Sequence, residues 1–369
     1  MEYPWETIVK LYRAQKRDRS EPTVESWALD FIAFLRRFGR IRQKEINENV
    51  HAILDSVFEE VETLAIQSAH LRNLPVPSNG YEDLLLELLE SRIRGVKASG
   101  RLLTAAQSRY VLSRFGNHIL SVVAHFVPSS KNRKLLDAAI EYGSRFLISN
   151  SFSPISTGVV VAGFGSSELF PSQVQFETDG YVGRQIKISK PDVSIISKRV
   201  TSSVSAFAQH DIVHRFMEGI DPDYGRYLEG SIRTALVEGN ISVFEKWAPA
   251  SSRNQKTRAL IRRAAERQFK RIHDAAIAYR RQEFWLPTVQ MVSLLPKDEL
   301  AHLAESLVEL TSLHRRVSRE IETVGGAIDV AVISKGDGFV WVKRKHYFKP
   351  ELNPQFDRNY MRDIPPRRR

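Results

Sequence analysis

The sequence contains no cysteine, which excludes disulfide bonds, thiolate nucleophiles and cysteine-ligated metal sites. It has no run of about 18 apolar residues, so a membrane-spanning helix is not expected. The N-terminal region lacks the apolar segment of a secretory signal peptide, and no complete phosphate-binding glycine loop occurs in the chain. These absences predict a cytoplasmic protein that has no cofactor and does not interact with a membrane.

Hydrophobic residues make up 42% of the 369 residues, which is enough to bury a sizeable core. The formal net charge is +11 at pH 7, and such an excess of cations favours binding to nucleic acid or to another anionic partner. Much of the excess lies in one expected helix, residues 253–283, and part of it lies near the C-terminus. The charge is therefore spread over the chain rather than gathered in one dense basic segment.

Hydrophobic periodicity predicts that the first 150 residues are almost wholly helical. Thr23 stands at the expected N-cap of the second helix, which carries Trp27, Phe31 and Phe34 on one face. The helices expected in this part of the chain span residues 4–17, 21–39, 45–71, 81–97, 101–126 and 131–148.

Strand-forming sequence begins after residue 150, where β-branched residues alternate with polar ones between glycines. Asp179-Gly180 is typical of a tight turn, so the sequence predicts a hairpin centred on this dipeptide. The expected strands span residues 156–165, 172–180, 184–189, 192–197, 327–333 and 339–343. Further helices are expected at 204–219, 225–237, 240–247, 253–283 and 295–318. The pattern as a whole predicts the α+β fold class.

Four stretches together are similar to a known group of bacterial proteins: "PWETIVKLYR" (4–13), "VVVAGFGSSELFPS" (159–172), "FAQHDIVHRFMEGIDP" (207–222) and "ETVGGAIDVAVISKGDGFVWVKRKHYF" (322–348). The group resembles the proteasome β-subunit in fold. The resemblance implies a partial Ntn-hydrolase-like αββα sandwich with antiparallel sheets, formed by residues 1–37 and 150–348. It also implies a large all-helical insertion at 38–149 and a basic tail at 349–369.

In such proteins the nucleophile is an N-terminal Thr, Ser or Cys whose free α-amine acts as the base. The resemblance implies that the strand carrying this residue precedes "PWETIVKLYR", so the chain is expected to be N-terminally truncated and inactive in peptide or amide hydrolysis as written. No catalytic residue is assigned. Self-cleavage at Gly165-Ser166 would expose a serine, but a turn between strands is the favoured interpretation. The resemblance also implies self-association into an oligomer.

His210 and His214 lie four residues apart on an expected helix and form a candidate metal pair. Their sequence, H-D-x-x-H, only approximates the H-E-x-x-H of zinc proteases, and no third ligand is evident. An exposed polar helix is therefore favoured, and no metal is expected.

Basic residues supply the remaining candidate site. The cations considered for binding nucleic acid or an acidic protein are Arg262, Arg263, Arg267, Lys270 and Arg271 on the expected helix 253–283, together with Lys343, Arg344 and Lys345 after the last strand. For each group, the favoured interpretation is a structural one: a solvated helix face for residues 253–283, and a core strand with a cationic end for the C-terminal group. Two hypotheses follow from the sequence. One is an inactive proteasome-like hydrolase relative, and the other is a non-enzymatic basic binding protein.

Overall fold

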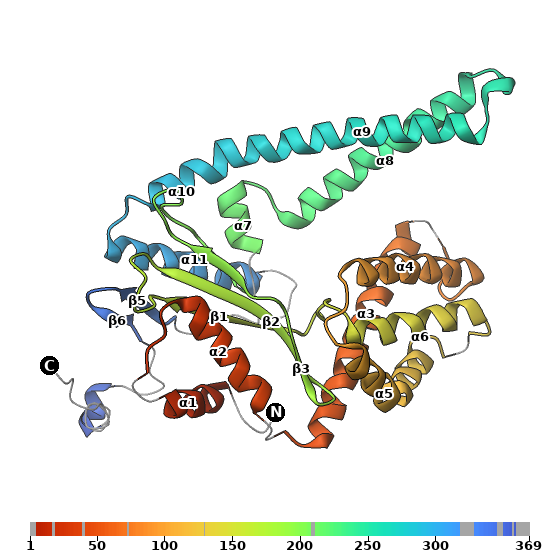
Figure 1. Ribbon diagram of the computed structural model, residues 1–369. Coiled ribbons are helices and arrows are strands. Elements are labelled where there is room, and N and C mark those ends of the chain that lie inside the picture. Colours follow the sequence, from red (N-terminus) through yellow and green to blue (C-terminus); the bar gives the residue numbers. More distant parts are fainter. Residues whose placement is uncertain are drawn as a thin grey trace. The chain divides into compact units, whose positions relative to one another are not determined.

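A computed structural model of the chain describes residues 5–16, 19–38, 41–71, 74–128, 130–207, 211–317, 328–344, 350–355 and 358 (Figure 1). The chain forms two compact units, Met1–Ile195 and Ile196–Arg369. Helices and small antiparallel sheets occur in both units, so the α+β class predicted from the sequence is confirmed. No helix in the described part of the chain is long and apolar enough to cross a membrane.

The sheet of the first unit is organised around one long strand, β2. Strand β1 pairs antiparallel with one edge of β2, while β3 and β4 pair antiparallel with its other edge at opposite ends. The strands are β1 (Thr157–Gly163), β2 (Ser172–Val182), β3 (Gln185–Ile188) and β4 (Asp192–Ile195). The strand positions expected in this region are therefore confirmed, apart from their ends.

The predicted hairpin is present as β2 and β3, but its predicted centre at Asp179-Gly180 is wrong. Strand β2 continues to Val182, and the chain turns at Gly183, whose φ of 67° lies in the left-handed region. In the pairing with β3, Thr178 is opposite Ile188 and Gly180 is opposite Lys187, so Asp179 is an extra residue in a β-bulge. The left-handed φ of 74° at Gly180 suits a bulge as well as a turn, which is why the dipeptide alone was misleading.

Helices α1 (Trp5–Lys16) and α2 (Val24–Arg37) cover one face of this sheet. Phe176 and Ile188 from the sheet pack with Ile8, Phe31 and Leu35 from the two helices. The N-cap predicted at Thr23 is confirmed, since the Thr23 and Ser26 side chains form a reciprocal capping box. The periodic apolar stripes of the sequence therefore mark the sheet-facing sides of both helices.

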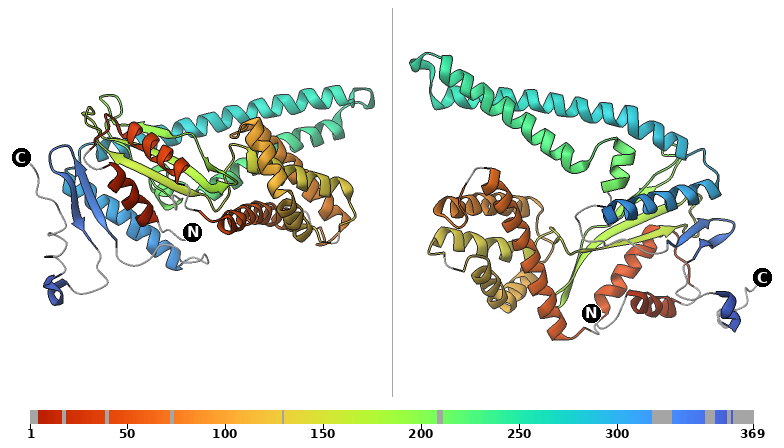
Figure 2. Two further views of the ribbon diagram at one scale, coloured as in Figure 1. Left: turned by 60° about the horizontal axis from the view of Figure 1, so that its bottom comes forward. Right: turned by 180° about the vertical axis from the view of Figure 1, so that it is seen from behind.

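Four helices form a block within the first unit (Figures 1 and 2). They are α3 (Gln43–Leu71), α4 (Asn79–Ala98), α5 (Ala105–Phe126) and α6 (Arg133–Ile148). Val50, Leu89, Val111, Phe115 and Leu135 lie at their shared core with no measurable exposure. The block falls inside the helical insertion expected at 38–149. That residues 1–37 and 150–348 form one domain remains a prediction.

The second unit is dominated by an antiparallel helical hairpin, α8 (Pro222–Trp247) and α9 (Gln255–Arg280), whose helices lie side by side in every view (Figures 1 and 2). Its other elements are α7 (Asp211–Glu218), a π-helical stretch (Arg281–Trp285), α10 (Leu286–Val292), α11 (Lys297–Val317), β5 (Val330–Ser334), β6 (Gly338–Lys343) and short 3₁₀ turns at Ala250–Ser252 and Pro350–Leu352. Strands β5 and β6 pair antiparallel, as the sequence predicts.

The sequence prediction divided α8 into two helices at Gly239, and this division is wrong. One helix runs through Gly239 and Asn240. A glycine in a helix interior costs only about 1 kcal/mol relative to alanine. Packing of α8 along α9 outweighs this local penalty.

The glycine-rich loop after β1 is a docking turn against the start of α2. The Glu168 carboxylate accepts hydrogen bonds from the backbone N–H groups of Val24 (3.0 Å) and Gly165 (2.6 Å). The backbone N–H groups of Ser166 and Ser167 donate to the carbonyls of Glu21 and Pro22. The turn interpretation of Gly165-Ser166 is confirmed by these contacts.

Gly165 has no room for a side chain, which gives a test of this docking. A Cβ atom added at Gly165 would lie 2.2 Å from the Pro22 carbonyl oxygen, so the backbone would have to move. We expect Gly165→Ala to lower the free energy of unfolding by about 1–3 kcal/mol, in the range of other overpacked sites. Urea denaturation measures the change. Gly158→Ala is the control, because nothing lies within 4 Å of its added Cβ, and equal losses in the two variants would contradict the docking argument.

Candidate functional site

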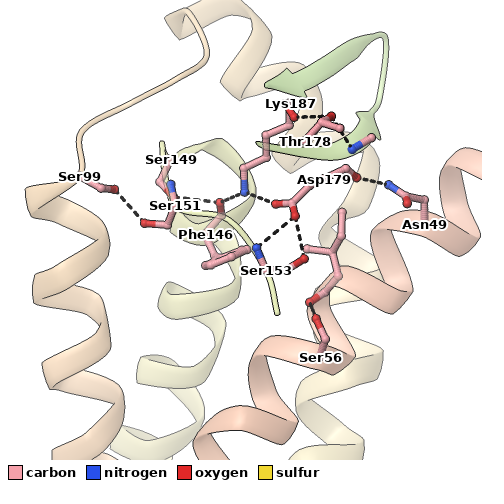
Figure 3. A network of polar contacts seen from close by, with 12 residues as sticks. Asn49, Ser56, Ser99, Phe146, Ser149, Ser151, Ser153, Thr178, Asp179 and Lys187 are labelled. Atoms are coloured by element: carbon pink, nitrogen blue, oxygen red, sulfur yellow. Dashed lines mark hydrogen bonds and ion pairs between the residues drawn. The ribbon is translucent and has the colours of Figure 1, made fainter. Parts of the chain in front are cut away.

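An ion pair buried between the sheet and the helical block is the most unusual polar feature of the first unit (Figure 3). The Lys187 Nζ atom on β3 lies 2.9 Å from Asp179 Oδ2 on β2, and the two side chains are 1% and 0% exposed. Charged side chains are almost never fully buried unless they are paired. The pair therefore calls for a structural or a functional explanation.

Hydrogen bonds from three parts of the chain hold the pair in place. The backbone N–H and the hydroxyl of Ser153 donate to Asp179 Oδ1 at 3.0 and 2.7 Å. The Lys187 ammonium donates to the Phe146 carbonyl in the last turn of α6, at 3.1 Å. The Asn49 amide on α3 donates to the Asp179 carbonyl at 2.8 Å. The network thus connects β2 and β3 to α3, α6 and the segment that follows α6.

The surroundings of Lys187 act on its charge in opposite directions. Burial lowers the pKa of Lys187 below its usual value, and the Asp179 carboxylate favours the charged form. The ammonium also lies 4.2 Å from the ring centroid of Phe146 and 5.3 Å from that of Phe152, where the ring faces attract a cation. Its position at the C-terminal end of α6 adds the negative end of the helix dipole. Together, these groups replace the interactions that the Lys187 ammonium would make with water.

A cavity of about 80 Å³ lies beside the pair, between the sheet, α1, α2 and α3. It is lined by apolar side chains such as Trp5, Ile8 and Phe38, and by Asp179 and Ser153 on its polar side. This volume holds a few water molecules. The Ser153 hydroxyl donates to a carboxylate that Lys187 already neutralises, so the arrangement lacks a free base that could activate it as a nucleophile. The chemistry available here is structural: the network fastens the sheet to the helices.

The sequence does not predict this network. In "RQIKIS" Ile186 and Ile188 alternate with polar residues, and this pattern does not mark Lys187 as a buried residue. It is buried because α6 lies beside this end of β3, while α1 and α2 cover the other face. Such a two-sided covering is set by the fold and leaves no local signal in the sequence.

Helix α9 holds most of the basic residues that the sequence analysis proposed, and it divides them between two sides. The side that faces α8 is neutralised by ion pairs. Arg262 lies 3.5 Å from Glu238, Arg258 lies 3.0 Å from Glu245, and Glu266 accepts from Arg233 of α8 at 2.7 Å. Farther along the helix, His273 and Arg280 lie within 4 Å of Glu229. This side of α9 therefore carries little free charge.

The opposite side of α9, called here the outer face, carries Lys256, Arg263, Arg267, Lys270 and Arg271. All five side chains are exposed, and none forms an ion pair with another residue in the part of the chain that the structure describes. Intervals of three, four and seven residues place them on one stripe of the helix. Four of the five α9 cations proposed from the sequence thus come together, whereas Arg262 belongs to the α8-facing side.

The cations proposed near the C-terminus do not form a second surface of unpaired charge like the outer face. Lys343 forms an ion pair with Glu305 of α11, which raises the pKa of Lys343. The Arg344 guanidinium lies 5.3 Å from the ring centroid of Trp341. Lys345 lies outside the described residues. The two described cations are therefore engaged by their own neighbours.

The structure describes only one of the two histidines in the candidate metal pair. His210 lies outside the described residues, and the Nδ1 atom of His214 lies 3.5 Å from Glu218 on the same helix. Within the described ranges, no group of three or more His, Cys, Asp or Glu side chains is arranged to hold a metal ion.

Comparison with known proteins gives no assignment: no family model matches the chain, and no curated protein or solved structure shows significant similarity to it. The resemblance to proteasome-like proteins therefore remains a prediction that rests on the four sequence stretches. The candidate function has to be argued from the geometry.

The buried pair predicts a strongly coupled response to substitution. Asp179→Asn and Lys187→Met each leave one partner buried without its counter-charge, so each is expected to lower the free energy of unfolding by about 3–5 kcal/mol. The double variant removes both charges and is expected to lose less than the sum of the two single losses. Urea denaturation of the three variants measures this coupling. Additive losses would show that the two charges do not depend on each other.

Proposed function

We propose that the chain is a non-enzymatic binding protein that engages nucleic acid through the outer face of α9. The observation that carries the proposal is the separation of charge on this helix. The cations facing α8 are matched by acids, whereas the five on the outer face have no described ion-pair partner. Unpaired cations that share one face are the electrostatic footprint of a surface that contacts phosphates.

A nucleic acid fits this face better than an acidic protein. Protein interfaces usually contain an apolar or aromatic centre surrounded by polar residues. Along the outer face, the apolar side chains between the cations are Ala259, Leu260 and Ala264, and the only carboxylate of α9 that shares this side is Asp274. A line of cations with little apolar surface matches a phosphate backbone, which needs charge neutralisation and little burial.

Charge removal on the outer face tests the proposal. We expect Arg263, Arg267, Lys270 and Arg271 changed together to Gln to weaken binding of a labelled oligonucleotide at least about tenfold at low salt. The reason is that four phosphate contacts and their counterion release are lost. Fluorescence anisotropy measures the affinity, and circular dichroism checks that the helices remain folded.

The matched control removes the same charge elsewhere. Lys10, Arg94, Arg109 and Lys134 are exposed residues of the first unit with no ion pair to another described residue. Changing these four to Gln lowers the net charge equally, and we expect it to leave binding within about threefold. Equal losses in both variants would show that total charge, rather than the outer face, drives binding. Absence of binding by the unaltered protein would refute the proposal.

A relation to the Ntn-hydrolase-like proteins is the second proposal. Helices α1 and α2 packed on one face of an antiparallel sheet form an arrangement that could be half of an αββα sandwich, which supports it. The opposite face of β2 carries Gln173, Gln175 and Glu177, which fits this role less well. In this proposal the protein is an inactive relative that self-associates.

The N-terminus of the protein purified from its native cells tests this second proposal. An N-terminal Thr, Ser or Cys, together with hydrolysis of peptide amides, is expected of an active processed hydrolase. A Met1 terminus, no hydrolysis and a ring-sized mass by light scattering would support the inactive relative. A monomer without hydrolysis would count against it.

A further inference from the structure

The shape and chemistry of the outer face restrict the kind of nucleic acid that it can bind. Lys256 and Arg271 lie about 22 Å apart along the axis, given a rise of about 1.5 Å per residue. Arg263, Arg267 and Arg271 follow one another at intervals of four residues, about 6 Å apart. The cations therefore form a stripe about 100° wide along one side of the helix, which fixes their backbone positions.

The hairpin of α8 and α9 holds the backbone of this stripe in place. Ion pairs between α8 and α9 occur along the whole contact, from Arg258 with Glu245 near one end to Arg280 with Glu229 near the other. Asn254 caps the start of α9 by accepting from the Thr257 backbone N–H. Because the backbone of this stripe is already ordered, binding to a stiff row of phosphates restricts only the side chains of the cations.

The outer face lacks the groups that bind single strands. Single-stranded nucleic acid is generally held by aromatic side chains on which the bases stack. Phe269 and His273 stack on each other, with ring centroids 5.7 Å apart, and His273 pairs with Glu229 of α8. Tyr279 is exposed, but it continues the line of Ile272 and Ala275 beside the outer face. The bases of a single strand would therefore find no aromatic partner on this face.

From these features we infer that the outer face of α9 binds the phosphate backbone of duplex nucleic acid without reading its base sequence. This inference rests on the proposed nucleic-acid function and narrows its substrate class. A duplex keeps its phosphates in two stiff and regular helical rows, with one charge per about 1.7 Å of axis when both strands are counted. Contacts to phosphates position a protein on a duplex but carry no sequence information.

The inference predicts how steeply the binding constant falls as the salt concentration rises. Five phosphate contacts to a duplex predict a slope of log K against log salt of about −4.5, because each contact contributes about −0.9. The quadruple Gln variant of the outer face keeps one of the five cations, so its slope is expected to flatten to about −0.9. The four-charge control variant is expected to keep the slope of the unaltered chain.

The experiment measures anisotropy with four labelled probes at several salt concentrations. The probes are a mixed-sequence duplex of 24 base pairs, a duplex of the same composition with shuffled sequence, an oligothymidine of 24 nucleotides, and polyglutamate. We expect the two duplexes to bind within about threefold of each other and at least about tenfold more tightly than the single strand. Tyr279→Ala and Trp247→Ala are expected to leave duplex affinity unchanged, because neither side chain belongs to the outer face.

Four other outcomes of this experiment would contradict the inference. Single-strand binding equal to or tighter than duplex binding would overturn the inference and leave the proposed function standing. Loss of affinity in the two aromatic variants would overturn it too, because stacking would then carry the binding. A large difference between the two duplexes would show sequence reading and would contradict backbone recognition. Binding of polyglutamate without either nucleic acid would overturn both the inference and the proposed function.

Discussion

The arrangement of the first unit depends on the buried ion pair between Lys187 and Asp179. Removing either charge from water costs several kcal/mol unless its partner and its hydrogen bonds are in place. Ser153 and the Phe146 carbonyl supply those bonds from the helical side, and β2 and β3 supply the charges. Apolar side chains tolerate small shifts, whereas a buried polar network is satisfied in only one geometry. The pair thus fixes how the sheet meets the helical block.

The same pair explains what the sequence could and could not predict. Helices follow from local periodicity, and the cap at Thr23 follows from residues within one turn, so both were predictable. Asp179-Gly180 was assigned to a turn because this dipeptide is typical of hairpins. It forms a bulge because Asp179 turns inward to Lys187, and that partner belongs to the next strand. Local patterns cannot reveal such a partner, since the covering of both sheet faces is a property of the whole fold.

The candidate binding face was predictable in composition but not in arrangement. The excess of cations on residues 253–283 is plain in the sequence. Their division into two sides depends on the register of α9 against α8, which places Glu238 opposite Arg262 and Glu245 opposite Arg258. These two acids lie more than ten residues before their partners in the sequence, and they neutralise only the side of α9 that faces α8. The free charge of a helix is therefore set by its neighbour, and a count of basic residues overestimates it.

Repulsion between the cations of the outer face destabilises α9. Arg263, Arg267 and Arg271 are like charges spaced four residues apart, an arrangement that destabilises a helix by a few tenths of a kcal/mol per pair. Asp274 of α9 shares this side, but no acid from the described part of α8 pairs with these three arginines. In the buried pair, in contrast, the two charges lie against each other, and Ser153 and the Phe146 carbonyl supply hydrogen bonds to them. A polyanion bound to α9, as proposed, would offset this repulsion, whereas Lys187 and Asp179 already compensate each other within the fold.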